Sequence, residues 1–294
     1  MADNSSQAEI RGIDIDRVAK GFADEDNVFK KFVTQSTTKA REIRWYQKTS
    51  GFLDSTDTTA ITASQIANVS FKARPVTVEQ SWTRNTSYIR KYFVESPLIA
   101  MEDIKDSDVD ILATNVRDLT RAVSRQVDKR IYDVLTEDLS VVNIQTAAST
   151  QDGWDDAATG DPIYDLLNAK QKIRTSGYNP EGAILAIHPI EHRNLIQYLI
   201  SVKGSSIPNW SSTAISSGVV MNILGLQVVV SENATTDYAL VFVPQRAATW
   251  KSFAPITATS ITDPGIGTKI RVWEEGECIL TDPKAVFLIT DTVT

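Results

Sequence analysis

The chain has 294 residues, of which 42% are hydrophobic and 23% charged, and it carries a formal net charge of −7 at pH 7. This composition is typical of a globular protein with a substantial core, in one large domain or two modest ones, and it argues against disorder over most of the length. Lysine and arginine are spread along the chain without a basic tail, which argues against avid direct binding to nucleic acid through released counterions.

The sequence also argues against an exported protein and against a zinc site. Residues 1–26 are acidic and lack the layout of a signal peptide, and no run approaches the roughly 18 apolar residues of a membrane helix. We therefore expect an unexported protein made in a cytoplasm. The single cysteine, Cys278, permits no internal disulfide, and a four-ligand zinc site would need this thiol, both histidines and a carboxylate.

The N-terminal segment is polar and of mixed composition. Its stretch "VAKGFADEDNVFKKFV" holds a few apolar residues at helical spacing, which favours one short helix. A poorly ordered terminus and an arm that becomes ordered only against a neighbour both fit this pattern.

Residues 42–95 are expected to form a long two-stranded excursion. In "NVSFKA", Val69, Phe71 and Ala73 alternate with polar residues, as in a strand, and the Thr- and Ser-rich residues 56–64 suit a loop tip. A lone hairpin is marginal in water, so its apolar face needs a partner, which another chain could supply.

A long amphipathic helix follows, because no Gly or Pro occurs between Pro97 and Gly153. Ser107 and Asp110 resemble a capping pair. Apolar residues then recur at steps of three and four, and basic residues mark another face: Leu112, Val116, Leu119, Val123, Val127, Ile131 and Val134; Arg117, Arg121, Arg125 and Lys129. The pattern predicts a structural spine of roughly 30 residues, about 45 Å long. A coiled coil fits less well, since the period is 3.6 and only one such helix is present.

A second helix is well delimited by its end signals. Asp161 is placed as N-cap, Pro162 suits the first turn and Gly177 suits the C-terminal stop. The apolar run "GAILAI" at residues 182–187 then predicts a short buried strand.

The stretch "AIHPIEHRNL" contains both histidines of the chain, His188 and His192. A zincin motif H-E-x-x-H needs both histidines inside one helix with the glutamate beside the first. Here Pro189 sits at the first helical position and Glu191 lies in the first turn, where its charge meets the helix dipole. The residues therefore favour a strand-to-helix turn over a metal site.

From Val219 onward, short apolar runs separated by Gly, Pro, Asn and Asp predict β structure, so the chain reads as α+β. "PGIGTKI" has neither the spacing nor the context of a phosphate-binding loop and predicts a hairpin turn. "WEEGEC" supplies Glu274, Glu275 and Glu277, which could do acid–base work. At a glycine turn, however, solvated carboxylates are expected.

Other candidate chemistry fails on context. Ser36 and Lys39 match S-x-x-K, but the supporting S-D-N element is missing. The tryptophans are scattered without clustered basic neighbours, which favours packing or subunit contacts over base stacking: Trp45, Trp82, Trp154, Trp210, Trp250 and Trp273. We expect no catalytic residue, metal or cofactor.

Four stretches, in order, resemble the major capsid proteins of tailed double-stranded DNA viruses, which have the HK97-type fold. The first, residues 81–137, holds a strand, an acidic break and the spine helix, and the second, residues 163–196, holds a helix ending in a Gly-Tyr turn and a strand leading into a dipeptide that starts another helix. The third, residues 223–242, is a glycine-led strand, a polar loop and a returning strand. The fourth, residues 270–290, contains the closing strands, with an Asp-Pro before the last one. His188-Pro189 stands at that dipeptide. One departure is Gln227, where many members have proline.

The resemblance implies an HK97-like organisation: residues 1–41 as N-arm, 42–95 as an E-loop lying across the neighbouring subunit, 96–181 as peripheral domain with the spine helix, 182–248 as axial domain, and 249–294 as strands returning to the peripheral domain. It implies no enzymatic activity. Candidate inter-subunit contacts are Trp45, Phe52, Phe71, Trp82 and Trp210.

The implied partners are copies of the same chain in pentamers and hexamers, with portal, scaffolding and cement proteins, in a virion capsid assembled in a host cytoplasm. The shell would enclose packaged double-stranded DNA without binding it specifically, in keeping with the acidic charge. An encapsulin shell shares the fold and stays open as an alternative. A cytoplasmic metal-dependent enzyme centred on His188 and His192, and a monomeric small-molecule binding module, are the remaining alternatives.

Overall fold

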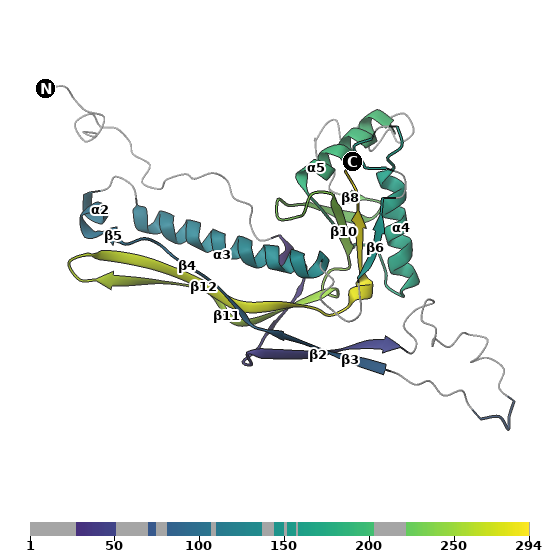
Figure 1. The fold of residues 1–294 in the computed structure, drawn as a ribbon, viewed down its shortest axis with the longest axis horizontal. Coiled ribbons are helices and arrows are strands. Elements are labelled where there is room, and N and C mark those ends of the chain that lie inside the picture. The colour runs from purple at the N-terminus through teal and green to yellow at the C-terminus, as the bar shows by residue number, and fades with distance from the viewer. Residues whose placement is uncertain are drawn as a thin grey trace.

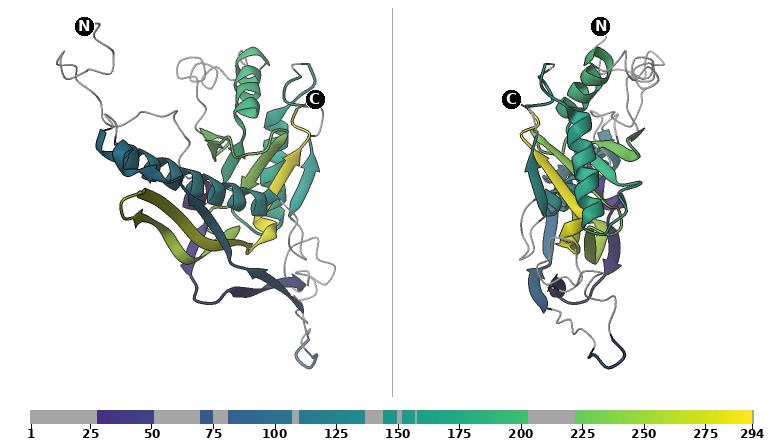
Figure 2. Two further views of the ribbon diagram at one scale, coloured as in Figure 1. Left: turned by 60° about the vertical axis from the view of Figure 1, so that its left-hand side comes forward. Right: turned by 90° about the vertical axis from the view of Figure 1, so that its right-hand side faces the viewer.

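The computed structural model describes residues 28–50, 70–74, 81–106, 110–136, 144–149, 152–156, 158–202 and 222–293. A long, narrow sheet with a helix laid along it is joined to a compact unit built on a six-stranded sheet, and a two-stranded hairpin lies beside the narrow sheet (Figure 1). Figure 2 shows the long helix on one face of the narrow sheet and α4 against the six-stranded sheet. The mixture of helices and strands confirms the predicted α+β class.

The described helices are α2 (Met101–Asp106), α3 (Ile111–Thr136), α4 (Pro162–Thr175) and α5 (Pro189–Gln197), which continues as a π-helical turn at Tyr198–Val202. Short 3-10 turns occupy Phe29–Lys31 and Pro283–Ala285. The described strands are β1 (Thr34–Thr37), β2 (Glu42–Ser50), β3 (Ser81–Tyr88), β4 (Arg90–Glu95), β5 (Ile99–Ala100), β6 (Gln145–Ala148), β7 (Ile184–Ile187), β8 (Asn222–Ile223), β9 (Leu226–Val230), β10 (Tyr238–Phe242), β11 (Ala248–Asp263), β12 (Gly267–Leu280) and β13 (Val286–Thr290).

Helix α3 confirms the predicted spine, at 26 residues and about 39 Å. Asp110 caps it, because its Oδ1 accepts the N–H of Ala113 at 3.0 Å. Ser107 lies outside the described residues. The apolar stripe is buried from Val123 onward, whereas Val116 is 37% exposed, so only the C-terminal half of the helix lies deep in the core.

The narrow sheet has the strand order β1-β11-β12-β4, with β5 also paired to β12. Strands β11 and β12 form a long antiparallel hairpin whose turn is Pro264–Ile266, as "PGIGTKI" predicts. Gly265 has a φ of +79° there, a backbone conformation that glycine adopts at little cost. Helix α3 packs along β12, so β12 is the central, covered strand of this sheet.

The six-stranded sheet has the order β6-β13-β10-β7-β9-β8. Its fully buried strand β7 follows α4, whose ends are those predicted: Asp161 Oδ1 accepts the N–H of Tyr164 at 3.2 Å, and Gly177 has a φ of +88°. Strand β13 pairs with β10 and β6. The range 249–294, expected to return to the peripheral domain, is therefore divided between the two sheets.

Strands β2 and β3 pair with each other as a two-stranded hairpin, within the range expected for the E-loop. The strand predicted in "NVSFKA" is wrong for its described part, because residues 70–74 form a turn in which Ala73 N–H donates to Ser70 O at 2.9 Å. The phenyl ring of Phe71 is fully exposed. Alternation alone misled the prediction, since the segment has no neighbouring strand in the described structure. The loop tip expected at residues 56–64 lies outside the described residues.

Candidate functional site

The acidic stretch of β12 forms a buried charged junction, which corrects the expectation of solvated carboxylates at a glycine turn. The exposed fraction is 1% for Glu274 and 0% for Glu277. Gly276 lies within the strand, and a Cβ there would come 2.4 Å from Cζ2 of Trp250. The glycine therefore serves close packing of the indole against the strand.

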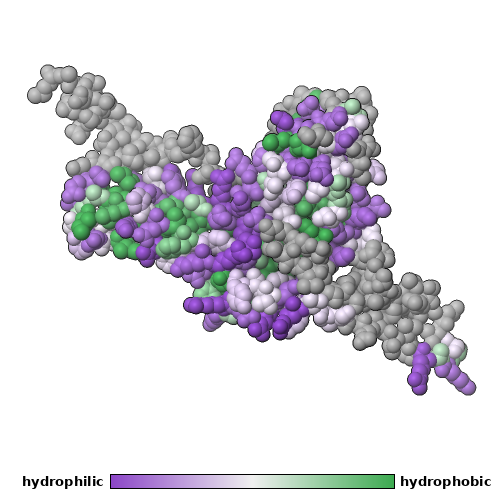
Figure 3. All heavy atoms as spheres, viewed as in Figure 1, coloured by the Kyte–Doolittle hydropathy of each residue, from purple (hydrophilic) through white to green (hydrophobic). Residues whose placement is uncertain are grey.

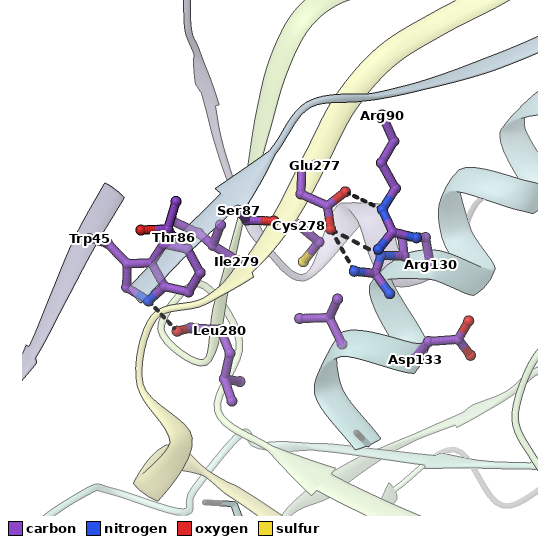
Figure 4. A pocket seen from close by; sticks show the side chains of 11 residues that line it. Trp45, Thr86, Ser87, Arg90, Arg130, Asp133, Glu277, Cys278, Ile279 and Leu280 are labelled. Carbon is purple, nitrogen blue, oxygen red and sulfur yellow. Dashed lines mark hydrogen bonds and ion pairs between the residues drawn. The ribbon is translucent and has the colours of Figure 1, made fainter. Parts of the chain in front are cut away.

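Glu277 joins two segments that are distant in sequence (Figure 4). Its Oε1 accepts from Nη2 of Arg130 at 2.7 Å and from Nε of the same guanidinium at 3.0 Å, and its Oε2 pairs with Nε of Arg90 at 3.0 Å. Arg130 lies on the spine helix α3 and Arg90 begins β4. The carboxylate thus ties the helix and the strand that leaves the hairpin to the centre of the narrow sheet.

Glu274 makes the corresponding tie to the N-terminal segment. Lys30 forms an ion pair with Glu274 and lies over the ring of Trp250, 5.5 Å from its centroid. The backbone N–H groups of Phe29 and Lys30 donate to Oδ1 of Asp128 on α3, at 2.7 and 3.0 Å. The junction therefore fixes the segment of Phe29 and Lys30 against α3 and β12.

Burial dominates the electrostatics of the junction. It raises the pKa of the Glu277 carboxyl, and the neighbouring Arg130 and Arg90 oppose this shift. Burial likewise raises the pKa of the Asp128 carboxyl, and the hydrogen bonds that this carboxyl accepts from backbone N–H groups oppose the shift. Buried charges are retained only with close partners, so the junction depends on all its members being in place.

A pocket of about 540 Å³ lies between the hairpin, β12 and the C-terminal part of α3 (Figure 4). Nε1–H of Trp45 and Nε2–H of Gln47 both donate to the carbonyl of Leu280, at 3.1 and 2.9 Å. Asn85 Nδ2 in turn donates to Gln47 Oε1 at 2.6 Å. These bonds hold the inner face of the β2–β3 hairpin to the end of β12.

The outer face of the hairpin carries exposed aromatic side chains. In the strand register Tyr46 lies opposite Arg84, and Tyr88 lies opposite Glu42. The exposed fractions of Tyr46, Trp82 and Tyr88 are 64%, 58% and 65%. Trp82 was a predicted contact residue, whereas the two tyrosines were missed, although their alternation along the strands could have shown them.

The other predicted contact residues have different environments. Trp45 is partly buried and bonded within its own subunit, so the structure does not bring it together with Trp82 on one face. Phe71 is exposed but lies in the separate turn at residues 70–74. Phe52 and Trp210 lie outside the described residues.

A second exposed apolar surface lies at the far end of the narrow sheet, where Figure 3 shows hydrophobic side chains gathered on the visible face. We name it the distal patch; it consists of Phe93, Leu98, Ile256, Ile261 and Ile266, each 37–53% exposed. Large apolar side chains exposed on a surface mark sites of protein association when they cluster.

His188 serves the strand-to-helix turn as the N-cap of α5. Nδ1 of His188 accepts the N–H of Ile190 at 3.3 Å and lies 3.7 Å from Oε2 of Glu191. Glu191 is fully buried and its Oε1 accepts the N–H of Asp237 at 2.6 Å. Burial lowers the pKa of His192. Among the described residues, no three His, Cys, Asp or Glu side chains are grouped as metal ligands, and no described helix is long and apolar enough to cross a membrane.

Cys278 provides a test of packing at the junction. The thiol is 3% exposed and burial raises its pKa. Because the thiolate is the reactive form, we expect iodoacetamide at pH 8 to alkylate the native subunit more than about tenfold slower than the denatured chain. Mass spectrometry of samples quenched over time measures both rates. A Thr259→Cys variant, with a thiol on the exposed part of β11, is the positive control. Equal rates for Cys278 in the native and denatured states would contradict the described packing.

Comparison with known proteins gives one family and many structures. A family model described as "Phage capsid protein" matches residues 99–289. Similar solved structures include Mycobacterium phage Che8, at 16% identity with a TM-score of 0.67, covering 95% of this chain and 96% of that one. The capsid of cyanophage P-SCSP1u is 14% identical with a TM-score of 0.69, and the match covers 93% of this chain and 90% of that one. The capsid of a native GTA particle is 11% identical with a TM-score of 0.71, and the match covers 98% of each chain. No curated protein gives a significant match to this chain.

Proposed function

Because this chain belongs to the phage capsid protein family, we propose that its copies assemble into an icosahedral shell of pentamers and hexamers around packaged double-stranded DNA. The chain is a capsid shell protein with the HK97-like fold, as the resemblance in its sequence predicted. The encapsulin alternative is not favoured, because the matching model is one of phage capsid proteins.

The observation that carries the proposal is the β2–β3 hairpin. Its inner face is bonded to β12 through Trp45 and Gln47, and its outer face exposes Tyr46, Trp82 and Tyr88. Such an aromatic face on a two-stranded hairpin is stable in water only when something covers it. A neighbouring subunit covers it in the proposed shell, with residues 42–95 acting as the E-loop.

The proposal extends to the partners of the shell. Portal, scaffolding and cement proteins would join copies of this chain in the virion capsid, with assembly in the host cytoplasm. The net charge of −7 supports a wall that encloses DNA without binding it specifically. A structural role without catalysis agrees with the family.

Electron microscopy of the expressed chain, alone and with any scaffolding protein encoded beside it, tests the proposal. Closed shells of uniform size are the expected result. Solution scattering that shows a compact monomer at every concentration, with scaffold present, would refute the proposal and would favour a monomeric binding module.

Deleting residues 50–70 is expected to leave a folded, soluble subunit and to abolish shell formation, because the deletion removes the middle of the proposed E-loop while the junction on β12 stays intact. Sedimentation and negative-stain images measure assembly, and circular dichroism measures folding. A variant that keeps the length but replaces residues 51–69 by Gly and Ser separates loss of contacts from loss of reach. Normal shells from both variants would rule out the E-loop assignment.

A further inference from the structure

The distal half of β11 is paired on one side only. Strand β1 runs beside β11 from Thr249 to Ser252, and Thr38 N–H donates to the carbonyl of Ser252 at 2.9 Å. Beyond that point, within the described residues, β11 pairs only with β12, up to Asp263. The side chains of residues 255–263 are all exposed. This segment is therefore an open strand edge, which we call the β11 edge (residues 257–262).

The hydrogen bonds of β12 show which backbone groups face outward from the β11 edge. Ile270 N–H donates to Ser96 Oγ at 3.0 Å and Ile270 O accepts from Ser96 N–H at 2.8 Å, so both groups of Ile270 point away from β11. Its cross-strand partner is Ser260. In an antiparallel pair the two residues of a non-hydrogen-bonded position point their N–H and C=O groups outward. Ser260 therefore presents both groups to the open side, and by alternation so do Ala258 and Thr262.

The sequence of the β11 edge lacks the usual protection of an exposed strand. Monomeric proteins guard such edges with charged side chains, proline or bulges, because open N–H and C=O groups template pairing with another chain. No charged residue occurs between Lys251 and Asp263, and Pro255 and the register shifts stand before the edge begins. The edge itself, "TATSIT", has three threonines and one isoleucine, residue types that favour strands.

The described part of the same subunit offers no strand to fill this edge. Strand β1 ends at Thr37 and the chain turns into β2. The β2–β3 hairpin lies beside the opposite, proximal part of the narrow sheet, bonded to Leu280 (Figure 1). The distal patch places exposed apolar side chains within the edge, at Ile261, and beside it in the turn, at Ile266. A strand arriving from outside would cover both the backbone groups and part of this patch.

We propose that the β11 edge accepts an extended strand from a second copy of this chain, which extends the narrow sheet across the boundary between two subunits. The partner is a copy because the family builds its shells from capsid chains, so the inference rests on the proposed function. Main-chain hydrogen bonds to Ala258, Ser260 and Thr262 would supply the attachment, and the flanking apolar side chains would fix its position.

Amide hydrogen exchange tests this without any mutation. In dispersed subunits the N–H groups of Ala258, Ser260 and Thr262 are expected to exchange fast, while those of Thr259 and Ile261, which face β12, are protected. In assembled shells the first three are expected to slow by at least about tenfold. Fragmentation of the peptide spanning the edge resolves the individual amides by mass spectrometry.

A proline variant tests the same edge by assembly. Ser260→Pro removes an N–H that makes no bond to β12, and proline is tolerated on an open edge, so the subunit is expected to melt like the wild type yet to assemble at least about tenfold less. Ser260→Ala keeps the N–H and is the matched control, expected to assemble normally.

Three results would overturn the inference. They are shells in which Ala258, Ser260 and Thr262 exchange as fast as in the dispersed subunit, dispersed subunits in which these amides are already protected, and normal shells from a folded Ser260→Pro variant. Each of these leaves the proposed function standing. A failure of the wild-type chain to form any shell would instead remove the proposed function and this inference with it.

Discussion

Glu277→Ala is expected to lower the free energy of unfolding of the dispersed subunit by about 3–5 kcal/mol, because it removes the buried anion that pairs with the Arg130 guanidinium. The side chain of Arg130 is 13% exposed, so it cannot turn fully to water, whereas that of Arg90 is 57% exposed and can. Urea unfolding followed by circular dichroism measures the loss.

Glu275→Ala is the matched control two residues away. The Glu275 carboxylate pairs with Lys91, whose side chain is 54% exposed, and a solvated pair of this kind contributes less than about 1 kcal/mol. A double variant, Glu277→Leu with Arg130→Met, is expected to recover much of the loss, since an apolar pair can replace a buried ion pair at little cost. If the two single glutamate variants were equally stable, the junction would not hold the subunit together.

Val123→Pro is expected to cost about 3 kcal/mol or more, because proline removes a backbone hydrogen bond and clashes with the preceding turn. The position is in the buried half of α3, packed in a cluster with Ile270 and Val272 of β12, and is 3% exposed. Globular domains are stable by only about 5–15 kcal/mol, so we expect little soluble subunit and no shells. Soluble yield, melting temperature and electron micrographs measure the outcome.

Val123→Ala separates loss of helix from loss of packing at the same site. It keeps the backbone of α3 and removes two methyl groups, which costs roughly 0.8 kcal/mol per group and a further cavity contribution. We expect this variant to fold and assemble. Wild-type expression and assembly from Val123→Pro would show that α3 is not a continuous helix.

Local signals in the sequence were sufficient for the elements that are fixed by their own residues. The unbroken period of α3, the Asp161-Pro162 start of α4 and the turn at Gly265 each depend on neighbours a few positions away. The strand-to-helix turn at His188 was predictable for the same reason.

The parts that could not be predicted depend on partners far along the chain. The local sequence around Glu277 predicts a solvated carboxylate. In the structure the side chain is buried, and Arg130, 147 positions earlier, supplies the counter-charge that makes this burial tolerable. Phe71 follows a strand pattern but has no neighbouring strand in the described structure. The pairing of β13 with β10 and β6 follows from topology, which short apolar runs do not encode.

The central place of β12 in the narrow sheet has a consequence for how the chain is made. The ribosome releases β1, β4 and α3 before this strand, so their apolar faces lack their main cover while the intervening chain is synthesised. At roughly 5–20 residues per second, the 147 positions between Arg130 and Glu277 take on the order of 7–30 s. A nascent or truncated chain that stops short of β12 has no β11 edge held in place and no anchor for the hairpin. Synthesis itself therefore delays each copy's competence to join its neighbours until almost the whole polypeptide has emerged.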